Sequence, residues 1–307
     1  MLDATRSRPA DPWLTAWATE IPRVLTGLSS ALQAGRLTEL VLHKSRRELK
    51  RLRSLLRLAP PSAGPLAEEA REFAGELRRR LGHSRDATVM LKTVRSFANE
   101  LGDAATRIEP VLSAHHRAVA GELDRSSRRA DHDRIVRLCA VWRGRSIGGS
   151  LAELREGAVK VYRRARKRAR SLAAGDRSAL HPLRRAVVDH QNQLSFFAGD
   201  LKTKSEISKL HKKVKRLRDT LGICNDFEVL RDFVRTRSDI SASDLIKLEE
   251  VLEKNHQQLV KKSVKLAAKL FDDPPREFAK WLKRSVRARE NAPEPVARPL
   301  AVTLSVV

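Results

Sequence analysis

Cysteine is scarce in this chain of 307 residues. Only Cys139 and Cys224 are present, far apart and outside any CxxC pattern. Two isolated cysteines argue against a disulfide framework and against a thiolate metal site. We therefore expect both thiols to be reduced, as in a cytoplasmic protein.

Long hydrophobic runs are missing as well. No apolar stretch approaches the roughly 20 residues that a membrane-spanning helix needs. The first residues, MLDATRSRPADPW, lack the apolar core of a secretory signal. The terminal PLAVTLSVV is apolar, but it is short and follows prolines. These absences predict a cytoplasmic protein that is not inserted in a membrane.

The motifs that usually carry catalysis are absent too. The chain has no glycine-rich phosphate loop, no GxSxG elbow and no set of kinase motifs. Its histidines form no HExxH arrangement, and its acidic residues are scattered rather than clustered to hold Mg²⁺. The sequence therefore predicts a binding protein and not an enzyme, without catalytic residues, metal ligands or a cofactor.

Negative charge is in short supply. Lys and Arg total 62 against 37 Asp and Glu, which gives a formal net charge of +25. Such an excess predicts affinity for a polyanion: nucleic acid, an anionic membrane surface or polymeric phosphate. Aromatic residues make up only 4% of the chain, with a single Tyr. That scarcity disfavours single-strand nucleic-acid binding, which relies on aromatic stacking platforms.

The residues that are abundant form helices. Leu, Ala, Arg, Glu and Lys dominate, and almost every window spaces its apolar residues with helical rather than alternating periodicity. We predict an all-α protein of roughly a dozen helices, the longest over 148–174, 180–199 and 244–270. Residues 1–11 and 290–307 are expected to be disordered or loosely docked. Helix breaks are predicted near Gly35, Pro60–Pro61, Gly82, Gly102–Asp103, 145–149, Gly175–Asp176, Gly222, 238–243 and Pro274–Pro275.

One sequence motif occurs twice. The stretch LRRRLGHSRDATVML (77–91) matches VKRLRDTLGICNDFEVL (214–230). Each predicts a helix, a Leu-Gly stop and a second amphipathic helix. A histidine with arginines at i+3 and i+4 opens a helix upstream of each copy. We infer two homologous halves, 12–143 and 148–289, each folded as a four-helix bundle.

Three residues near these motifs have structural interpretations. Asp86 and Asp226 follow the Leu-Gly stops, and we interpret both as helix N-caps. The alternative is that each aspartate orients an arginine of a binding site. His190 falls on the apolar face of its helix, with Leu183 and Phe197, and is predicted to be a structural histidine rather than a ligand.

Cationic side chains line one face of several predicted helices. The helix that contains HKSRRELKRLR is cationic on one face and carries leucines on the other. Its cationic face comprises His43, Arg46, Arg47, Lys50, Arg53 and Arg57. The same spacing recurs at Lys160, Arg163, Arg164, Lys167 and Arg170, and again at Lys209, Lys212, Lys213 and Arg216. The second histidine helix repeats it only over His181, Arg184 and Arg185.

These stripes have two explanations. Solvated helix faces normally mix both signs, because Glu–Lys pairs stabilise a helix while like charges repel. The first stripe contains no acid, and its pattern recurs along the chain. We therefore favour the hypothesis that unpaired cationic stripes converge where a polyanion binds. Stripes that lie on unrelated, outward-facing surfaces would contradict it.

Several sequence motifs, taken in their order along the chain, resemble those of the CHAD family. The name stands for conserved histidine α-helical domain. The resemblance rests on HKSRRELKRLRSLLRL, LRRRLGHSRDATVM, VYRRARKRARSL leading into HPLRRAVV, and LGICNDFEVL, and it extends from Trp13 to Arg287. It implies one domain of two pseudo-symmetric four-helix bundles, with a basic central channel or groove lined by the histidine helices. The family signature matches at His43, Arg46, Lys50, Arg51 and Arg53, and at His181, Arg184 and Arg185. Val188 stands where the family usually has another Lys.

The resemblance also implies that this channel or groove binds inorganic polyphosphate, and we expect the cationic stripes above to supply the binding residues. Non-specific nucleic-acid binding is the main alternative, because it uses the same attraction to phosphate. An enzyme of polyphosphate metabolism would need an acidic cluster for metal, which the chain lacks. The sequence leaves open whether the site is a channel or a groove, which polymer length it prefers and what the oligomeric state is. It also leaves open whether the cellular role is granule targeting, stress signalling or enzyme regulation.

Overall fold

The structure is a computed structural model that describes residues 11–33, 38–119, 125–199 and 205–290. Regular structure in these ranges is entirely helical, which confirms the predicted all-α class. The α-helices are α1 (Pro12–Gln33), α2 (Glu39–Leu56), α3 (Gly64–Arg80), α4 (Gly82–Ser96), α5 (Ala98–Leu101), α6 (Asp103–Val119), α7 (Arg125–Gly144), α8 (Leu151–Ala173), α9 (Leu180–Ala198), α10 (Glu206–Arg235), α11 (Ala242–Leu270) and α12 (Pro275–Glu290). Two short 3₁₀ helices, η1 (Pro61–Ala63) and η2 (Arg177–Ala179), precede α3 and α9.

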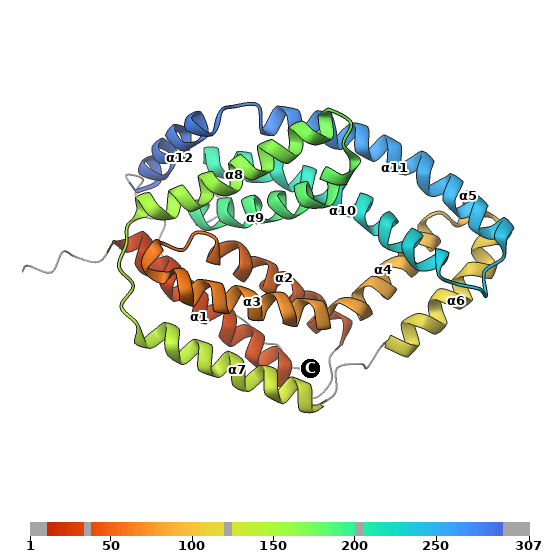
Figure 1. Cartoon of the computed structure of the whole chain (residues 1–307), viewed down its shortest axis with the longest axis horizontal. Coiled ribbons are helices and arrows are strands. Elements are labelled where there is room, and N and C mark those ends of the chain that lie inside the picture. Colours follow the sequence, from red (N-terminus) through yellow and green to blue (C-terminus); the bar gives the residue numbers. More distant parts are fainter. Residues whose placement is uncertain (1–10, 34–37, 120–124, 200–204, 291–307) are drawn as a thin grey trace, which may run out of the picture.

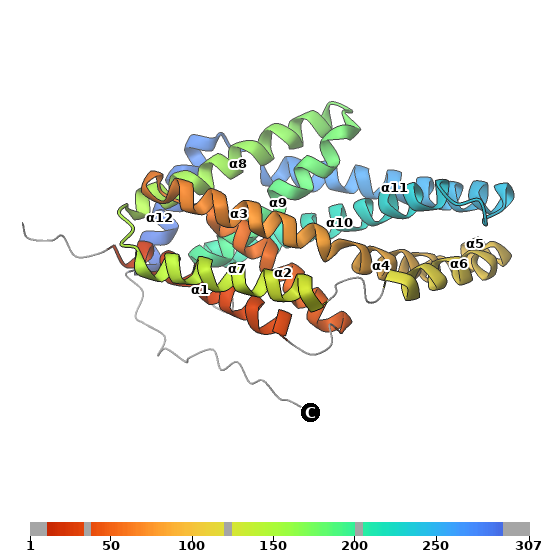
Figure 2. The same ribbon diagram turned by 60° about the horizontal axis from the view of Figure 1, so that its bottom comes forward.

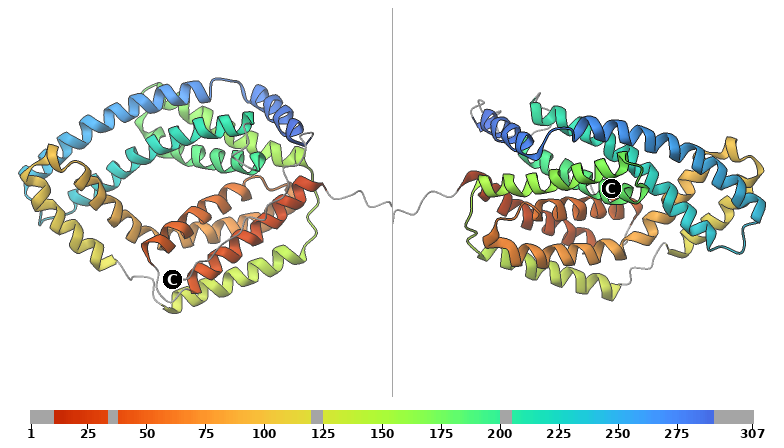
Figure 3. Two further views of the ribbon diagram at one scale, coloured as in Figure 1. Left: turned by 180° about the vertical axis from the view of Figure 1, so that it is seen from behind. Right: turned by 45° about the horizontal axis from the view of Figure 1, so that its top comes forward.

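The helices form two groups that meet in the middle of the molecule. Helices α1, α2, α3 and α7 lie on one side, and α8, α9 and α12 lie on the other (Figure 1). The long helices α10 and α11 continue past the second group to reach α4, α5 and α6 (Figure 2). Seen from behind, α11 passes along one edge of the molecule until it meets α5 and α6 (Figure 3). The two groups join where α2 packs against α9.

Two hydrophobic cores hold this arrangement together. The larger core is built around Trp17, Phe73 and Phe197, and it draws leucines from α1, α2, α3, α8 and α9. The smaller core joins α4 and α6 to the far ends of α10 and α11, around Ile108 and Leu230. Both cores therefore combine residues from the two predicted halves, 12–143 and 148–289. A twofold relation between the halves stays a prediction.

Most predicted helix breaks coincide with observed ones. Helix α2 ends before Pro60, and α5 and α6 are separated by Gly102, whose φ of 57° lies in the region that favours glycine. Pro274 directly precedes α12. Several helices begin with a side-chain cap, such as Thr38, whose hydroxyl accepts a hydrogen bond from the Val41 backbone N–H. The break predicted near Gly35 lies outside the described residues.

The break predicted at Gly222 is wrong. Helix α10 runs without interruption from Glu206 to Arg235, the longest helix in the described part of the chain. A glycine inside a helix costs only about 1 kcal/mol relative to alanine. The buried residues Leu221, Cys224 and Phe227 continue the apolar face past Gly222, so packing outweighs that cost.

The N-cap interpretation of the two aspartates is also wrong. Asp226 lies inside α10, and Asp86 lies inside α4, whose N-cap position is occupied by Leu81. A carboxylate oxygen of Asp86 instead lies 3.9 Å from Arg46 Nη2. Asp86 therefore lies beside an arginine, which is only one part of the alternative interpretation.

The described helices begin at Pro12 and end at Glu290, and the bounds of the domain stay a prediction. Asp11, which we placed in a disordered terminus, caps α1 by accepting a hydrogen bond from the Trp13 N–H at 2.9 Å. Its second oxygen accepts one from the Leu151 N–H at 2.6 Å. Helix α12 extends to Glu290. Residues 1–10 and 291–307, where we predicted disorder, lie outside the described residues. Within the described residues, no helix combines the length and apolarity that a bilayer span requires.

Candidate anion-binding site

Side-chain hydrogen bonds hold the two histidine helices, α2 and α9, against each other. The hydroxyl of Ser54 on α2 donates to Asp189 Oδ1 at 2.9 Å and accepts from Asn192 Nδ2 at 3.0 Å. The side chain of Gln193 donates to the backbone oxygen of Ser54 at 3.0 Å. Because these residues are buried or half-buried, the bonds set the relative position of the helices that carry the predicted site residues.

A small cavity opens at this helix contact. Its volume is about 50 Å³. The lining comprises Lys50, Arg53, Arg57, Arg78, His181, Arg184, Arg185, Val188 and Asp189. Six of these nine side chains are cationic at any physiological pH, and one is a carboxylate. The cations come from α2, α3 and α9, so three helices direct like charge into one space.

Some cations of the cavity are partly desolvated and lie close to one another. Burial, together with the charges of Arg78, Arg57 and Arg185 and against the pull of Asp189, lowers the pKa of Arg53 to about 10. The pKa of Arg78 is lowered by burial and by Arg185. A lowered arginine pKa means that the fold destabilises the charged form, which a bound anion would stabilise.

Two donors in the cavity lack an acceptor. Among the described residues, the buried Nε atoms of Arg53 and Arg78 have no hydrogen-bond partner. Buried polar groups in folded proteins are nearly always hydrogen-bonded. An anion with several oxygens could satisfy these donors, since a guanidinium group binds such oxygens in pairs.

The cationic cluster extends beyond the cavity lining. Burial lowers the pKa of Arg71 on α3, and the charges of Arg57 and Arg164 lower it further. Burial likewise lowers the pKa of Arg164 on α8, with Arg57 as the largest charged neighbour that lowers it. We define the α2–α9 cluster as Lys50, Arg53, Arg57, Arg71, Arg78, Arg164, His181, Arg184 and Arg185. Four helices contribute to it.

His181 is the histidine of this cluster. Its Nδ1 lies 3.1 Å from Oδ1 of Asn225 on α10. Burial lowers its pKa, and the charges of Arg184, Arg185 and Arg78 lower it further, although the bond to Asn225 opposes the shift. The imidazole is therefore mainly neutral near pH 7 and would gain a proton beside a bound anion. The other predicted histidine, His43, is exposed on α2 and does not line the cavity.

Seven of the predicted site residues therefore meet at the α2–α9 contact. They are Lys50, Arg53, Arg57, Arg164, His181, Arg184 and Arg185. The predicted role of Arg46 needs correction, because its side chain is buried and its Nη1 donates to the backbone oxygen of Leu81 at 2.6 Å. Arg46 thus braces the junction of α3 and α4. Arg47 is exposed, with its Nε 3.7 Å from Glu48.

The stripes on α8 and α10 lie elsewhere. Their remaining members are exposed, and none of them lines the cavity: Lys160, Arg163, Lys167, Arg170, Lys209, Lys212, Lys213 and Arg216. Lys160 Nζ lies 2.8 Å from Glu156, and Lys209 Nζ lies 2.6 Å from Glu206. The description of these stripes as unpaired is therefore wrong for both lysines, because an acid stands one helical turn away.

Sequence reasoning missed three residues at the site. Arg71 and Arg78 lie on α3, whose arginines show no cationic stripe of their own. Asp189 is the one carboxylate of the lining. Only the packing of α3 and α9 against α2 brings these side chains to the cavity, so the helical wheel of a single segment gave no signal for them.

His190 is structural, as predicted. Its side chain is 1% exposed and contacts the rings of Tyr162, Phe271 and Phe278. Burial lowers its pKa to about 3. A histidine in this environment stays neutral at physiological pH and contributes to the core.

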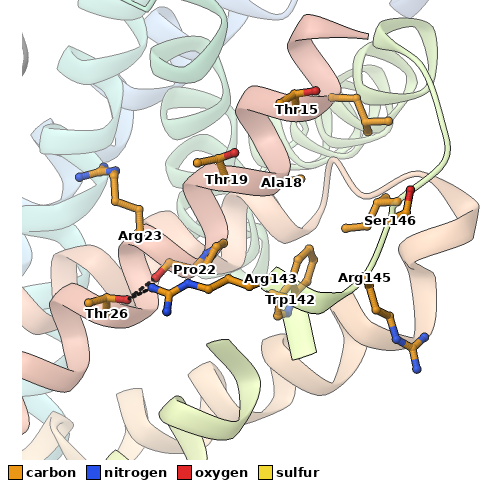
Figure 4. Close-up of a pocket in the computed structure, with 12 residues that line it drawn as sticks. Thr15, Ala18, Thr19, Pro22, Arg23, Thr26, Trp142, Arg143, Arg145 and Ser146 are labelled. Atoms are coloured by element: carbon orange, nitrogen blue, oxygen red, sulfur yellow. Dashed lines mark hydrogen bonds between the residues drawn. The ribbon is translucent and has the colours of Figure 1, made fainter. Parts of the chain in front are cut away.

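A larger hollow of about 600 Å³ lies between α1 and the end of α7 (Figure 4). It is lined by Leu14, Thr15, Ala18, Thr19, Pro22, Arg23, Thr26, Trp142, Arg143, Arg145, Ser146 and Ile147. Its walls mix apolar groups with arginines, and Arg143 Nη2 donates to Thr26 Oγ1 at 3.1 Å. No predicted site residue lines it. We therefore take the smaller, highly charged cavity as the candidate site.

Comparison with known proteins agrees with the sequence motifs and the helical fold. Residues 25–235 match the CHAD domain family, more than half of the chain. The chain belongs to the CHAD domain family. The crystal structure of the CHAD domain from the plant Ricinus communis aligns with a TM-score of 0.51 and 20% sequence identity, over 91% of this chain and 92% of that one. At this identity the likeness concerns the fold alone. No curated protein matches the chain.

Within the described residues of this CHAD protein, no group of three or more His, Cys, Asp or Glu side chains could hold a metal ion. Both cysteines are buried and free. The site itself presents cationic donors from three helices, some of them partly desolvated.

Proposed function

We propose that this CHAD protein binds inorganic polyphosphate at the α2–α9 cluster and does so without catalysis. The observation that carries the proposal is the convergence of six cations and one carboxylate on a single cavity. Bringing like charges together in a partly desolvated place is unfavourable unless an anion usually occupies it. Polyphosphate supplies a negative charge on every repeating unit and oxygens that guanidinium groups can bind in pairs.

The size of the cavity supports a narrow anion. Its volume of about 50 Å³ is far below the roughly 300–1,000 Å³ typical of pockets that enclose small molecules. A nucleobase or a nucleotide does not fit inside such a space, whereas a phosphate unit of a linear polymer is of its scale. The polymer would place individual units against the cluster and continue along the surface.

Nucleic acid is the competing ligand, because its backbone offers the same charges. Exposed aromatic platforms would favour single strands. The aromatic contacts in the described part of the chain lie instead largely in the core, such as the stacked pair Tyr162 and Phe278. A general attraction to duplex phosphate is expected for any protein of this charge, so selectivity decides between the ligands.

Competitive binding at physiological salt tests the proposal. Labelled long-chain polyphosphate bound to the protein is challenged with duplex DNA and with single-stranded RNA at equal phosphate concentration. We expect that nucleic acid displaces the label only in large excess. Equal competition by all three polymers would overturn selective polyphosphate binding and leave a general polyanion binder.

In a cell, selective binding would bring this protein to polyphosphate granules in the cytoplasm.

A further inference from the structure

Asp189 is the one carboxylate among the side chains that line the cavity. Its side chain is only 13% exposed, and its Oδ2 lies 2.8 Å from Arg57 Nε. The other oxygen accepts the hydrogen bond from Ser54 across the α2–α9 contact. An acid in the centre of a proposed polyanion site is unexpected, since it repels the ligand that the surrounding arginines attract.

The charge of Asp189 acts on arginines of three helices. It opposes the lowering of the pKa of Arg53 on α2, of Arg71 on α3 and of Arg164 on α8. It therefore stabilises the charged forms of several guanidinium groups that otherwise repel one another. The carboxylate therefore lies among the same arginines that an anionic ligand would contact.

The geometry of the Arg57 pair points to charge compensation rather than to a directed bond. Although Nε and Oδ2 are 2.8 Å apart, the buried Nε of Arg57 has no hydrogen bond of acceptable geometry among the described residues. A side chain that positioned the guanidinium for a ligand would be expected to hold it through aligned N–H···O bonds.

We propose that Asp189 is the resident counter-anion of the empty site and that it competes with bound phosphate for the arginines of the cluster. This inference rests on the proposed function. In the empty protein the carboxylate offsets repulsion within the cluster. In the complex the carboxylate lies beside the negative charge of the bound phosphate, so it lowers the affinity for polyphosphate. The same carboxylate stabilises the fold of the empty protein. Asp189 thus sets how tightly the site binds, without contributing a contact that attracts the ligand.

The test is Asp189→Asn, which keeps the shape and removes the charge. We expect the affinity for polyphosphate of defined length to rise about tenfold, the order produced by removing one like charge near a ligand in a partly hydrated site. The melting temperature of the empty variant falls below that of the wild type. Saturating polyphosphate then raises the melting temperature of the variant by more than it raises that of the wild type.

Asp219→Asn is the matched control. Asp219 is exposed on α10, where it pairs with Arg218 at 2.5 Å and Lys215 at 3.6 Å, and it does not line the cavity. The same change of net charge there should alter the affinity less than twofold, because exposed charges are screened. An equal gain in both variants would show a general charge effect and overturn the assignment to Asp189.

An unchanged or lower affinity of Asp189→Asn would also overturn the inference, and a clear loss would mean that the carboxylate positions Arg57. A wild-type protein that fails to bind polyphosphate would instead refute the proposed function itself, so the two failures are distinct. If Asp189→Asn does not fold, the comparison is made between Arg57→Gln and Arg57→Gln/Asp189→Asn, in which the pair is removed together. The double variant should bind more tightly than the single one, and equal or weaker binding would reject the counter-anion.

Discussion

The cationic stripes on α2 and α8 look alike in sequence and differ in space. On α2 the positions i, i+3, i+4 and i+7 are His43, Arg46, Arg47 and Lys50, and on α8 they are Lys160, Arg163, Arg164 and Lys167. On α2, Arg53 and Arg57 face arginines of α3 and α9 in a small cavity. On α8, Arg163 and Lys167 are exposed, and Lys160 pairs with Glu156 one turn away. Solvent and nearby acids screen the outward stripe, whereas partial burial of Arg53, Arg57 and Arg78 keeps their charges strong.

The comparison teaches that a cationic stripe becomes a candidate site only when other helices bring like charge to it. Arg164 illustrates this within one helix. It belongs to the α8 stripe by sequence, yet its charge acts on Arg57, Arg71 and Arg185, and burial lowers its pKa. Arg163 and Arg164 are both exposed, so it is the neighbouring arginines of other helices that set Arg164 apart.

The largest expected effect is on ligand affinity. Replacing Arg53 and Arg185 together by Gln should weaken polyphosphate binding about 100-fold, since a hydrogen bond to a charged group contributes roughly 1.5–3 kcal/mol and each 1.4 kcal/mol is tenfold. The matched variant Arg163→Gln/Lys167→Gln loses the same charge from the outward stripe and should lose less than about threefold. Titration calorimetry at physiological salt measures both. Equal losses would erase the distinction between the two regions.

Variants at Arg46 and Arg47 compare a buried and an exposed arginine of α2 by their effect on stability. Arg46→Met leaves the Leu81 carbonyl without its buried donor and removes one charged neighbour of Asp86, so the free energy of unfolding should fall by about 2–3 kcal/mol. Arg47→Gln, one position along and exposed, should change it by less than about 0.5 kcal/mol. Urea denaturation of both variants gives the answer. A stable Arg46→Met protein with weakened binding would return Arg46 to the ligand site.

Gly157 tests the close packing of α8 against the end of α2. A Cβ at this position would lie 2.7 Å from Leu58 Cα and 2.8 Å from the Arg57 backbone oxygen. Gly157→Ala should therefore destabilise the fold by about 1–3 kcal/mol and displace Arg57. Gly75→Ala is the control, because a Cβ there meets nothing within 4 Å and alanine favours a helix by up to about 1 kcal/mol. We expect Gly157→Ala to lower the melting temperature and Gly75→Ala to raise it. A similar change in both variants would mean that α8 can shift to accommodate the added methyl group.

The smallest expected effect is a pH dependence through His181. Its pKa is lowered in the empty protein by burial and by neighbouring arginines, and a bound anion would raise it. Binding therefore takes up a proton, and the affinity for long chains should increase a few-fold as the pH falls from about 7.5 to about 6. The variant His181→Asn should flatten this dependence, as measured by titrations at several pH values. A wild-type affinity that is constant with pH would exclude a direct role for His181.

The fold was largely predictable from local sequence signals. Prolines and glycines at Pro60, Gly102 and Pro274 interrupt the helical periodicity, and the helices end there. The failure at Gly222 has a physical cause, because a single glycine weakens a helix by less than the burial of Leu221 and Cys224 stabilises it. Local signals rank possible breaks, and tertiary packing decides among them.

The candidate site was predictable only in part. The histidine helices supplied Lys50, Arg53, Arg57, His181 and Arg185 from their spacing alone. Arg78 and Asp189 could not be predicted, because a wheel describes one helix and the cavity depends on how α3 and α9 pack on α2. For the same reason the sequence did not separate Arg46, turned toward Leu81, from its exposed neighbour.

The most direct test of the central claim is a crystal structure of the protein with a polyphosphate of defined length. We predict phosphate oxygens within hydrogen-bond distance of Arg53, Arg78 and Arg185, with the adjoining phosphate units leaving the cavity along the surface. Phosphate bound only along Arg163 and Lys167 of α8, with the α2–α9 cavity empty, would contradict it.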